Sequence, residues 1–229
     1  MKRNLNEKSL VLAFTLLELL VVISIVMILA SILLPALKKT KETSSRILCA
    51  SNMKQISLGS AMYADDKSGW LPLGGTTGEW RNDVYNYVGG REDLSALTDL
   101  QKLSYILSRN KLFFCPSLPG SIKSMSGFIT GIGWNYKYMG YKEFDTIYPS
   151  PRIMVSRIPR PAETIMFGDT SDDYSVWFRN VHLYTPGDLG WIIIPRHYGR
   201  INMACADGHI DSNNTSFFCS NPDLYKVIK

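Results

Sequence analysis

The stretch SLVLAFTLLELLVVISIVMILASILLPALKKTK, residues 9–41, decides how this chain is organised. From Phe14 to Leu34 it holds 21 residues that are all apolar or small except Glu18. An α-helix rises about 1.5 Å per residue, so this run spans roughly 31 Å, the thickness of a bilayer's hydrocarbon core. A carboxylate inside such a span costs about 2.5–3.5 kcal/mol by insertion scales. We therefore expect a membrane-spanning helix in which Glu18 serves a function.

The residues around Glu18 carry a resemblance to a known family. Ala13-Phe14-Thr15-Leu16-Leu17-Glu18 resembles the processing site of type IV prepilins and type II secretion pseudopilins. That motif is a small residue, then Phe-Thr-Leu-x-Glu, then an unbroken hydrophobic helix. The family usually has Gly before the cut, where this chain has Ala13, which is also small. Pro35 matches the proline that bends the first helix in many pilins.

The resemblance implies how the N-terminus is processed and used. Residues 1–13 are then a basic leader that a prepilin peptidase removes between Ala13 and Phe14, and Phe14 becomes N-methylated. Glu18 then neutralises the terminal amine of a neighbouring subunit during assembly. The physics agrees, because a carboxylate away from water needs a cationic partner and the positive end of a helix favours it.

The same resemblance implies a domain order and a location. Residues 1–13 form the leader, residues 14–35 the transmembrane and assembly helix, and residues 36–229 a globular head that includes the amphipathic half of the long helix. The protein is then a single-pass protein of the inner membrane, with its head on the periplasmic or extracellular side or on a filament surface. Its partners are the membrane, the prepilin peptidase and other pilin or pseudopilin subunits. The basic residues that flank the span are nearly balanced and do not set the orientation.

Other interpretations of the apolar run differ in what they require. A secretory signal peptide needs a small-x-small cleavage site after the run, and none follows near Ala30 or Ala36. A buried helix of a soluble protein is disfavoured, because the run is too long and too apolar. An uncleaved single-pass anchor remains an alternative.

Composition limits the rest of the chain. The 229 residues carry a net charge of +5, which is too weak to indicate nucleic-acid binding. About 165 residues follow the helix, enough for one compact domain with a core. The four cysteines form no C-x-x-C pair; they are Cys49, Cys115, Cys205 and Cys219. In an exported domain they suggest disulfides, with three possible connectivities, and in a cytosolic domain they would be ordinary buried thiols.

The hydrophobic pattern predicts an α+β fold. We expect the first helix to continue to about Ala64, with a narrow buried stripe laid against a sheet; the stripe comprises Cys49, Met53, Ile56, Ser60 and Tyr63. Residues 92–109 predict a second helix, and residues 113–117 a short strand that ends in a turn. Short strands separated by turn residues indicate an antiparallel sheet. The expected strands are 132–139, 153–158, 163–168, 174–181, 190–194, 200–206 and 209–211.

Two further motifs resemble a large pseudopilin-like family. The segment from Cys49 to Ile56 looks like its C-x-N-N-L-K-Q stretch, and His197 followed by nine residues and Asp207-Gly208 matches its C-terminal H-x9-DG signature. The favoured interpretation is that Asp207-Gly208 makes a two-residue hairpin turn. The sharper alternative is that His197, Asp207 and His209 converge on a metal or ligand.

Two other clusters are candidates for binding. Asp169, Asp172 and Asp173 supply hard oxygen ligands that suit calcium, as in the major pseudopilins of type II secretion, although a plain solvated turn is favoured. The alternating aromatics at Trp134, Tyr136 and Tyr138 suggest either a carbohydrate platform or core packing, and packing is favoured.

The sequence favours a structural protein over an enzyme. It contains no G-x-S-x-G, P-loop or H-E-x-x-H motif, and no cofactor is expected. The leading hypothesis is a prepilin-like subunit of a type IV pilus or type II secretion pseudopilus. The alternative is a membrane-tethered binding protein that presents its α+β head to carbohydrate, metal or peptide.

Overall fold

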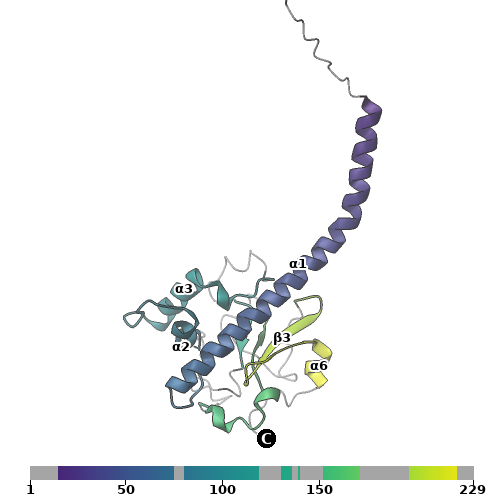
Figure 1. Cartoon of the computed structure of the whole chain (residues 1–229). Coiled ribbons are helices and arrows are strands. Elements are labelled where there is room, and N and C mark those ends of the chain that lie inside the picture. Colours follow the sequence, from purple (N-terminus) through teal and green to yellow (C-terminus); the bar gives the residue numbers. More distant parts are fainter. Residues whose placement is uncertain are drawn as a thin grey trace, which may run out of the picture. The chain divides into compact units, whose positions relative to one another are not determined.

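The computed structural model describes residues 15–74, 80–118, 130–135, 139, 152–170 and 196–220. The chain divides into two compact units, one up to Lys41 and one from Glu42 onwards. Helix α1 (Leu16–Asp66) supplies the helical part of the first unit and enters the second (Figure 1). The other elements belong to the second unit: α2 (Trp80–Tyr85), η1 (Asn86–Val88), α3 (Asp99–Arg109), η2 (Lys111–Phe113), β1 (Ile132–Trp134), η3 (Val155–Arg157), η4 (Pro161–Glu163), β2 (Ile165–Asp169), β3 (Arg200–Cys205), β4 (Ile210–Asn214) and α6 (Thr215–Ser220).

Helix α1 begins with a capping box. The Glu18 N–H donates to Thr15 Oγ1 at 3.2 Å, and the Thr15 N–H donates to Glu18 Oε2 at 2.9 Å, so two otherwise unpaired backbone donors are satisfied. Pro35 lies inside the helix, where it cannot donate the hydrogen bond that an interior residue normally makes. The large apolar side chains from Leu16 to Leu37 are exposed. As expected, α1 is long and apolar enough to cross a membrane.

The C-terminal half of α1 buries one face, as predicted. All five residues of the predicted stripe are buried: Cys49, Met53, Ile56, Ser60 and Tyr63. The helix ends at Asp66, two residues beyond the expected boundary, where Ser68 and Gly69 take positive φ of 55° and 86°. The Gly69 N–H returns to the Ala64 carbonyl oxygen at 2.7 Å and closes the last turn.

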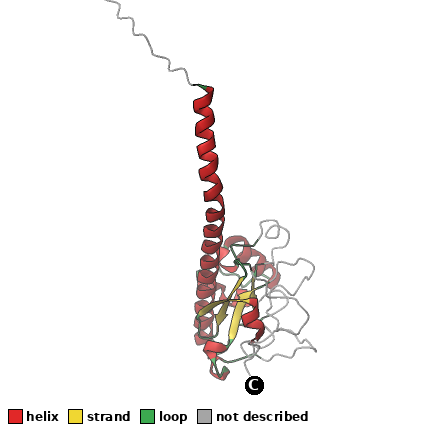
Figure 2. Ribbon diagram, turned by 90° about the vertical axis from the view of Figure 1, so that its right-hand side faces the viewer, coloured by secondary structure: helices red, strands yellow, loops and turns green. Residues whose placement is uncertain are grey.

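The strands form one antiparallel sheet in the order β1-β2-β3-β4, which confirms the α+β class. Figure 2 shows these strands beside the C-terminal half of α1. Trp134 pairs with Phe167, and Phe167 with Ala204, after an irregularity between Ile165 and Phe167. Paired residues share a face of a sheet, so these side chains lie on one face.

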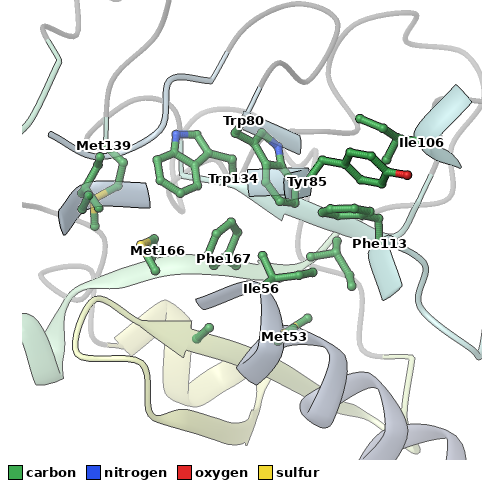
Figure 3. Packing of buried hydrophobic residues seen from close by; sticks show 14 of the residues in the cluster. Met53, Ile56, Trp80, Tyr85, Ile106, Phe113, Trp134, Met139, Met166 and Phe167 are labelled. Atoms are coloured by element: carbon green, nitrogen blue, oxygen red, sulfur yellow. The ribbon is translucent and has the colours of Figure 1, made fainter. Parts of the chain in front are cut away.

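That face of the sheet meets α1 and α2 in an aromatic core. Phe167 lies with its ring centroid 5.0 Å from that of Trp80 and 4.9 Å from that of Trp134. Met53 and Ile56 of α1 lie on the opposite side of Phe167 from the two indoles (Figure 3). All five side chains are fully buried. Trp134 is therefore a core residue, which agrees with the favoured interpretation; Tyr136 and Tyr138 lie outside the described residues.

Several predicted elements differ in the structure. Residues 113–117 form the end of η2 and a turn instead of a strand. Residues 153–158 form a single bridge from Met154 to Trp70 and then η3 instead of a strand. Helix α3 begins only at Asp99, because Thr98 and Gln101 form a capping box there. The expected strands at 174–181 and 190–194 lie outside the described residues.

Candidate functional site

Four side chains from four separate segments meet inside the second unit. They are Cys49 of α1, Cys115 after η2, Asp169 at the end of β2 and His197 just before β3. One nitrogen, sulfur or oxygen atom from each lies within 4.8 Å of the other three. The exposed fraction is 0% for Cys49, Cys115 and Asp169 and 1% for His197. We call this group the cysteine-histidine cluster.

The distances within the cluster are short. Cys49 Sγ lies 3.4 Å from Asp169 Oδ1. Cys115 Sγ lies 3.6 Å from His197 Nε2, and the same nitrogen lies 3.6 Å from Asp169 Oδ2. The four groups therefore face a common centre and are not merely neighbours along one surface.

The backbone around Cys115 and Asp169 holds these two side chains in place. The Cys115 N–H donates to the Thr130 carbonyl oxygen at 2.8 Å, which ties the segment after η2 to the residues just before β1. Asp169 pairs with Ile132 across the sheet, and its Oδ2 accepts the Asn202 N–H at 2.7 Å. The carboxylate thus keeps a fixed orientation on the face that packs on α1.

A tight turn positions His197. Tyr198 and Gly199 both have positive φ, 53° and 77°, which is the backbone of a type I′ hairpin turn. His197 and Arg200 exchange backbone hydrogen bonds of 3.3 and 3.2 Å across that turn. The turn brings the imidazole to the N-terminal end of β3, beside Asp169 of the neighbouring strand β2.

The other ring nitrogen of His197 has its own partners. His197 Nδ1 lies 3.2 Å from Ser117 Oγ and 3.3 Å from Glu42 Oε1, and the Ser117 hydroxyl donates to the same Glu42 oxygen at 3.0 Å. Nδ1 is therefore held by a carboxylate and a hydroxyl, while Nε2 faces Cys115 and Asp169. Neither Glu42 nor Ser117 belongs to a motif that sequence reasoning could have singled out.

Charge is distributed unequally between the two thiols. Hydrogen bonding from Cys49 and then from His197 overcomes burial and lowers the pKa of Cys115 to about 5. Hydrogen bonding with Cys115, burial and the nearby Asp169 together raise the pKa of Cys49 well above its usual value. Burial by itself would lower the pKa of His197, but Asp169 and Cys115 outweigh it and raise that pKa to about 10. These contacts therefore favour the thiolate form at Cys115 over Cys49.

The H-x9-DG residues do not converge on one site. His197 and Asp207 flank β3 at opposite ends, and six residues of strand separate them by about 20 Å. Asp207 Oδ1 instead accepts the backbone N–H of His209 at 3.0 Å and contacts His209 Nδ1 at 2.7 Å, with both side chains partly exposed. The alternative of a metal site at His197, Asp207 and His209 is wrong, because a strand keeps its two ends apart.

The favoured turn at the other end of β3 is present, with one residue more than expected. Gly208 has φ of +84°, its N–H donates to the Cys205 carbonyl oxygen at 2.8 Å, and the Cys205 N–H donates to the His209 carbonyl oxygen at 2.9 Å. Three residues, Ala206 to Gly208, therefore lie between the hydrogen-bonded residues Cys205 and His209, with a left-handed glycine in the last position.

The structure describes the side chains of three of the four cysteines. Cys49, Cys115 and Cys205 are free thiols. Cys205 follows Ala204 on β3 and so points to the opposite face of the sheet from the cysteine-histidine cluster, which keeps it from pairing with either of the other two. The side chain of Cys219 lies outside the part of the chain that the structure describes.

The first residue of the acidic cluster at 169–173 does not lie in a solvated turn. Asp169 is fully buried and faces two sulfurs and an imidazole, which are softer ligands than calcium prefers. Asp172 and Asp173 lie outside the described residues.

A cavity of about 460 Å³ lies elsewhere in the second unit, between the end of α1, α2 and α3. Polar side chains in its wall are paired with one another. Arg152 donates to the Tyr63 hydroxyl oxygen at 2.7 Å, and the Tyr85 hydroxyl donates to Glu92 at 2.8 Å.

Comparison with models of known protein families, with curated proteins and with solved structures finds no match to this chain.

Proposed function

We propose that this chain is a structural subunit of a type IV pilus or a type II secretion pseudopilus, which is cleaved and methylated at Phe14 and assembles through α1. One observation carries the proposal. An exposed apolar helix begins directly after the Ala13-Phe14 motif, and within its apolar run the sole charged side chain is Glu18 in the first turn.

The second unit supplies further support. The apolar side chains Ile47, Leu48, Leu58 and Met62 on α1 are 61%, 53%, 61% and 46% exposed. At about 100° per residue they fall within an arc of about 100°, roughly opposite the buried stripe. We call these four residues the outer stripe. A helix with apolar residues on two opposite faces suits packing against the same helix of other subunits.

Processing is the first test. We expect the protein purified from membranes of cells with an active prepilin peptidase to begin at Phe14 with one added methyl group, as measured by N-terminal mass spectrometry. Replacing Ala13 by Trp should leave the leader attached, because the motif requires a small residue there. Leu12→Trp is the adjacent control and should still be cleaved. Wild-type protein that still starts at Met1 contradicts the proposal.

The role of Glu18 is the second test, and the capping box makes it selective. If Glu18 only caps the helix, Glu18→Gln keeps that function, because glutamine also completes a capping box. If the carboxylate neutralises a neighbouring amine, Glu18→Gln and Glu18→Ala both lose assembly, because both remove the charge. We expect both variants to be cleaved normally and to give few crosslinked oligomers, with Glu163→Gln in the exposed part of the head as the matched control. Normal oligomers from Glu18→Gln contradict an electrostatic role.

A further inference from the structure

We propose that the cysteine-histidine cluster binds a zinc ion that fastens α1 to the sheet of the head. The inference does not depend on the proposed function, because it uses only residues of the second unit. The zinc site gives one function to four residues that the sequence did not connect. Cys49 and Cys115 were considered as cysteines, Asp169 as part of an acidic run, and His197 as part of the H-x9-DG signature.

The spacing of the four groups fits a tetrahedral ion. Zinc lies about 2.3 Å from a thiolate sulfur and about 2.0–2.2 Å from an imidazole nitrogen or a carboxylate oxygen. At tetrahedral angles, two such ligands lie roughly 3.4–3.8 Å apart. The separations in the cluster are 3.4 Å for Cys49 to Asp169, 3.6 Å for Cys115 to His197, and 3.6 Å for His197 to Asp169. These are three of the six edges of a ligand tetrahedron, and the two that involve Asp169 use different oxygens of its carboxylate. All four ligand atoms lie within 4.8 Å of one another.

The types of ligand favour zinc over other ions. Two sulfurs with one imidazole and one carboxylate are too soft a set for calcium or magnesium. All four ligands come from the protein and all are buried, which is the closed form of a structural site rather than the open form of a catalytic one. On binding, the Cys49 thiol, any protonated Cys115 and the His197 imidazolium each release a proton to water, so that His197 coordinates through Nε2 of a neutral imidazole. Two thiolates, one carboxylate and Zn²⁺ then leave a net charge of −1.

The surroundings of the cluster supply the partners that zinc ligands normally have. A metal-bound histidine usually donates its other ring N–H to a carboxylate or carbonyl oxygen, which fixes its orientation. His197 Nδ1 faces Glu42 Oε1 at 3.3 Å and Ser117 Oγ at 3.2 Å. Asp169 is likewise oriented by the Asn202 N–H at 2.7 Å. Glu42 and Asn202 are therefore positioning residues for the site.

Two other uses of the cluster fit the structure less well. A disulfide between Cys49 and Cys115 would explain the two sulfurs but not the carboxylate and imidazole directed at them. Nucleophilic catalysis by Cys115 with His197 needs a path for substrate, and these residues are only 0% and 1% exposed. Zinc accounts for all four side chains and for their burial.

The test uses the full chain, purified in detergent without added metal or chelator. We expect elemental analysis to find close to one zinc ion per chain. Cys115→Ser and His197→Gln should each lose most of that zinc and lower the melting temperature, since a ligand that binds only the folded state stabilises it. Cys205→Ser is the matched control: it alters another buried cysteine on the opposite face of the sheet and should retain zinc.

Two further measurements keep the proposal testable if the ligand variants fold poorly. Wild-type protein reloaded with Co²⁺ should show thiolate-to-cobalt charge-transfer absorption and strong visible bands, the signature of a tetrahedral site with sulfur ligands. Glu42→Gln, which leaves all four ligands in place, should weaken zinc affinity by about 10–100-fold. An intact mass showing a Cys49–Cys115 disulfide in metal-free wild-type protein, or equal zinc content in wild type and His197→Gln, overturns the proposal.

Discussion

His197 and Gly208 lie near opposite ends of β3, and each belongs to a turn that adjoins the strand. The nine residues between His197 and Asp207 comprise the Tyr198-Gly199 turn, the strand and the first residue of the next turn. The length of the H-x9-DG signature in this chain is therefore the length of one strand with its two turns. The strand therefore sets the spacing between His197 and Gly208. His197 lies in the cysteine-histidine cluster, and Gly208 lies in the turn that reverses the chain.

Gly208 is a residue of this hairpin at which substitution should be costly. Its φ of +84° lies in the left-handed region, and its carbonyl oxygen accepts a 2.7 Å hydrogen bond from Lys54 Nζ of α1. We expect Gly208→Val to lower the free energy of unfolding by about 1–3 kcal/mol, because a β-branched residue is strained at positive φ. Chemical unfolding monitored by circular dichroism measures the loss. Gly208→Asn is the matched control, since asparagine tolerates this conformation, and an equal loss in the two variants argues against backbone strain as the cause.

Helix α1 makes a close contact with α2 and η1 in the second unit. Gly59 is buried on α1, and a Cβ atom there would lie 2.5 Å from Val88 Cγ1 and 2.9 Å from Val84 Cγ1. Both neighbours are β-branched and have little rotamer freedom. The absence of a side chain at residue 59 therefore sets how closely these elements approach.

This contact predicts an unusual result for a helical glycine. Gly59→Ala should raise intrinsic helix stability by about 1 kcal/mol, yet the overlap with two valines should cost more, about 1–3 kcal/mol. We expect a net loss of stability in chemical unfolding. The double variant Gly59→Ala with Val88→Ala should recover part of the loss, because the closest clash is removed. A gain of stability from Gly59→Ala alone shows that α1 and α2 can move apart without cost.

At the scale of the whole molecule, the second unit carries exposed apolar side chains among its described residues. The outer stripe is one such set of exposed apolar side chains. It lies on α1, the helix that also contains the apolar run of the first unit. Under the proposed function the stripe packs against α1 of neighbouring subunits. Its residues then contribute to assembly and little to the stability of the isolated chain.

The double variant Leu58→Gln with Met62→Gln tests this division. We expect it to reduce the yield of crosslinked oligomers in membranes while changing the unfolding free energy of the chain by no more than about 0.5 kcal/mol, as is usual for surface positions. Val155→Gln is the matched control, because Val155 is an exposed apolar residue of η3 rather than of α1. Unchanged oligomer yield in the double variant places the subunit contacts elsewhere.

The sequence alone determined the features that depend on neighbouring residues. The apolar run, the buried stripe of α1 and the turn at Asp207-Gly208 follow from helical periodicity and local backbone preference, and the structure has all three. The antiparallel character of the sheet was also predictable, because turn residues separate short strands. The end of β1 at Trp134 and the single bridge at Met154 were not, since both depend on pairing with segments far away in the sequence.

Only the tertiary structure decided which polar residues act together. Cys49, Cys115, Asp169 and His197 were each notable in the sequence, but it placed them in disulfides, in an acidic turn and in a group with Asp207 and His209. Their meeting depends on strand register and on how α1 lies across the sheet, which are long-range consequences of packing. Strand alternation likewise separates Cys205 from the other two cysteines. Local spacing carries no information about such contacts, because the chain between the four segments can take many paths before the core forms.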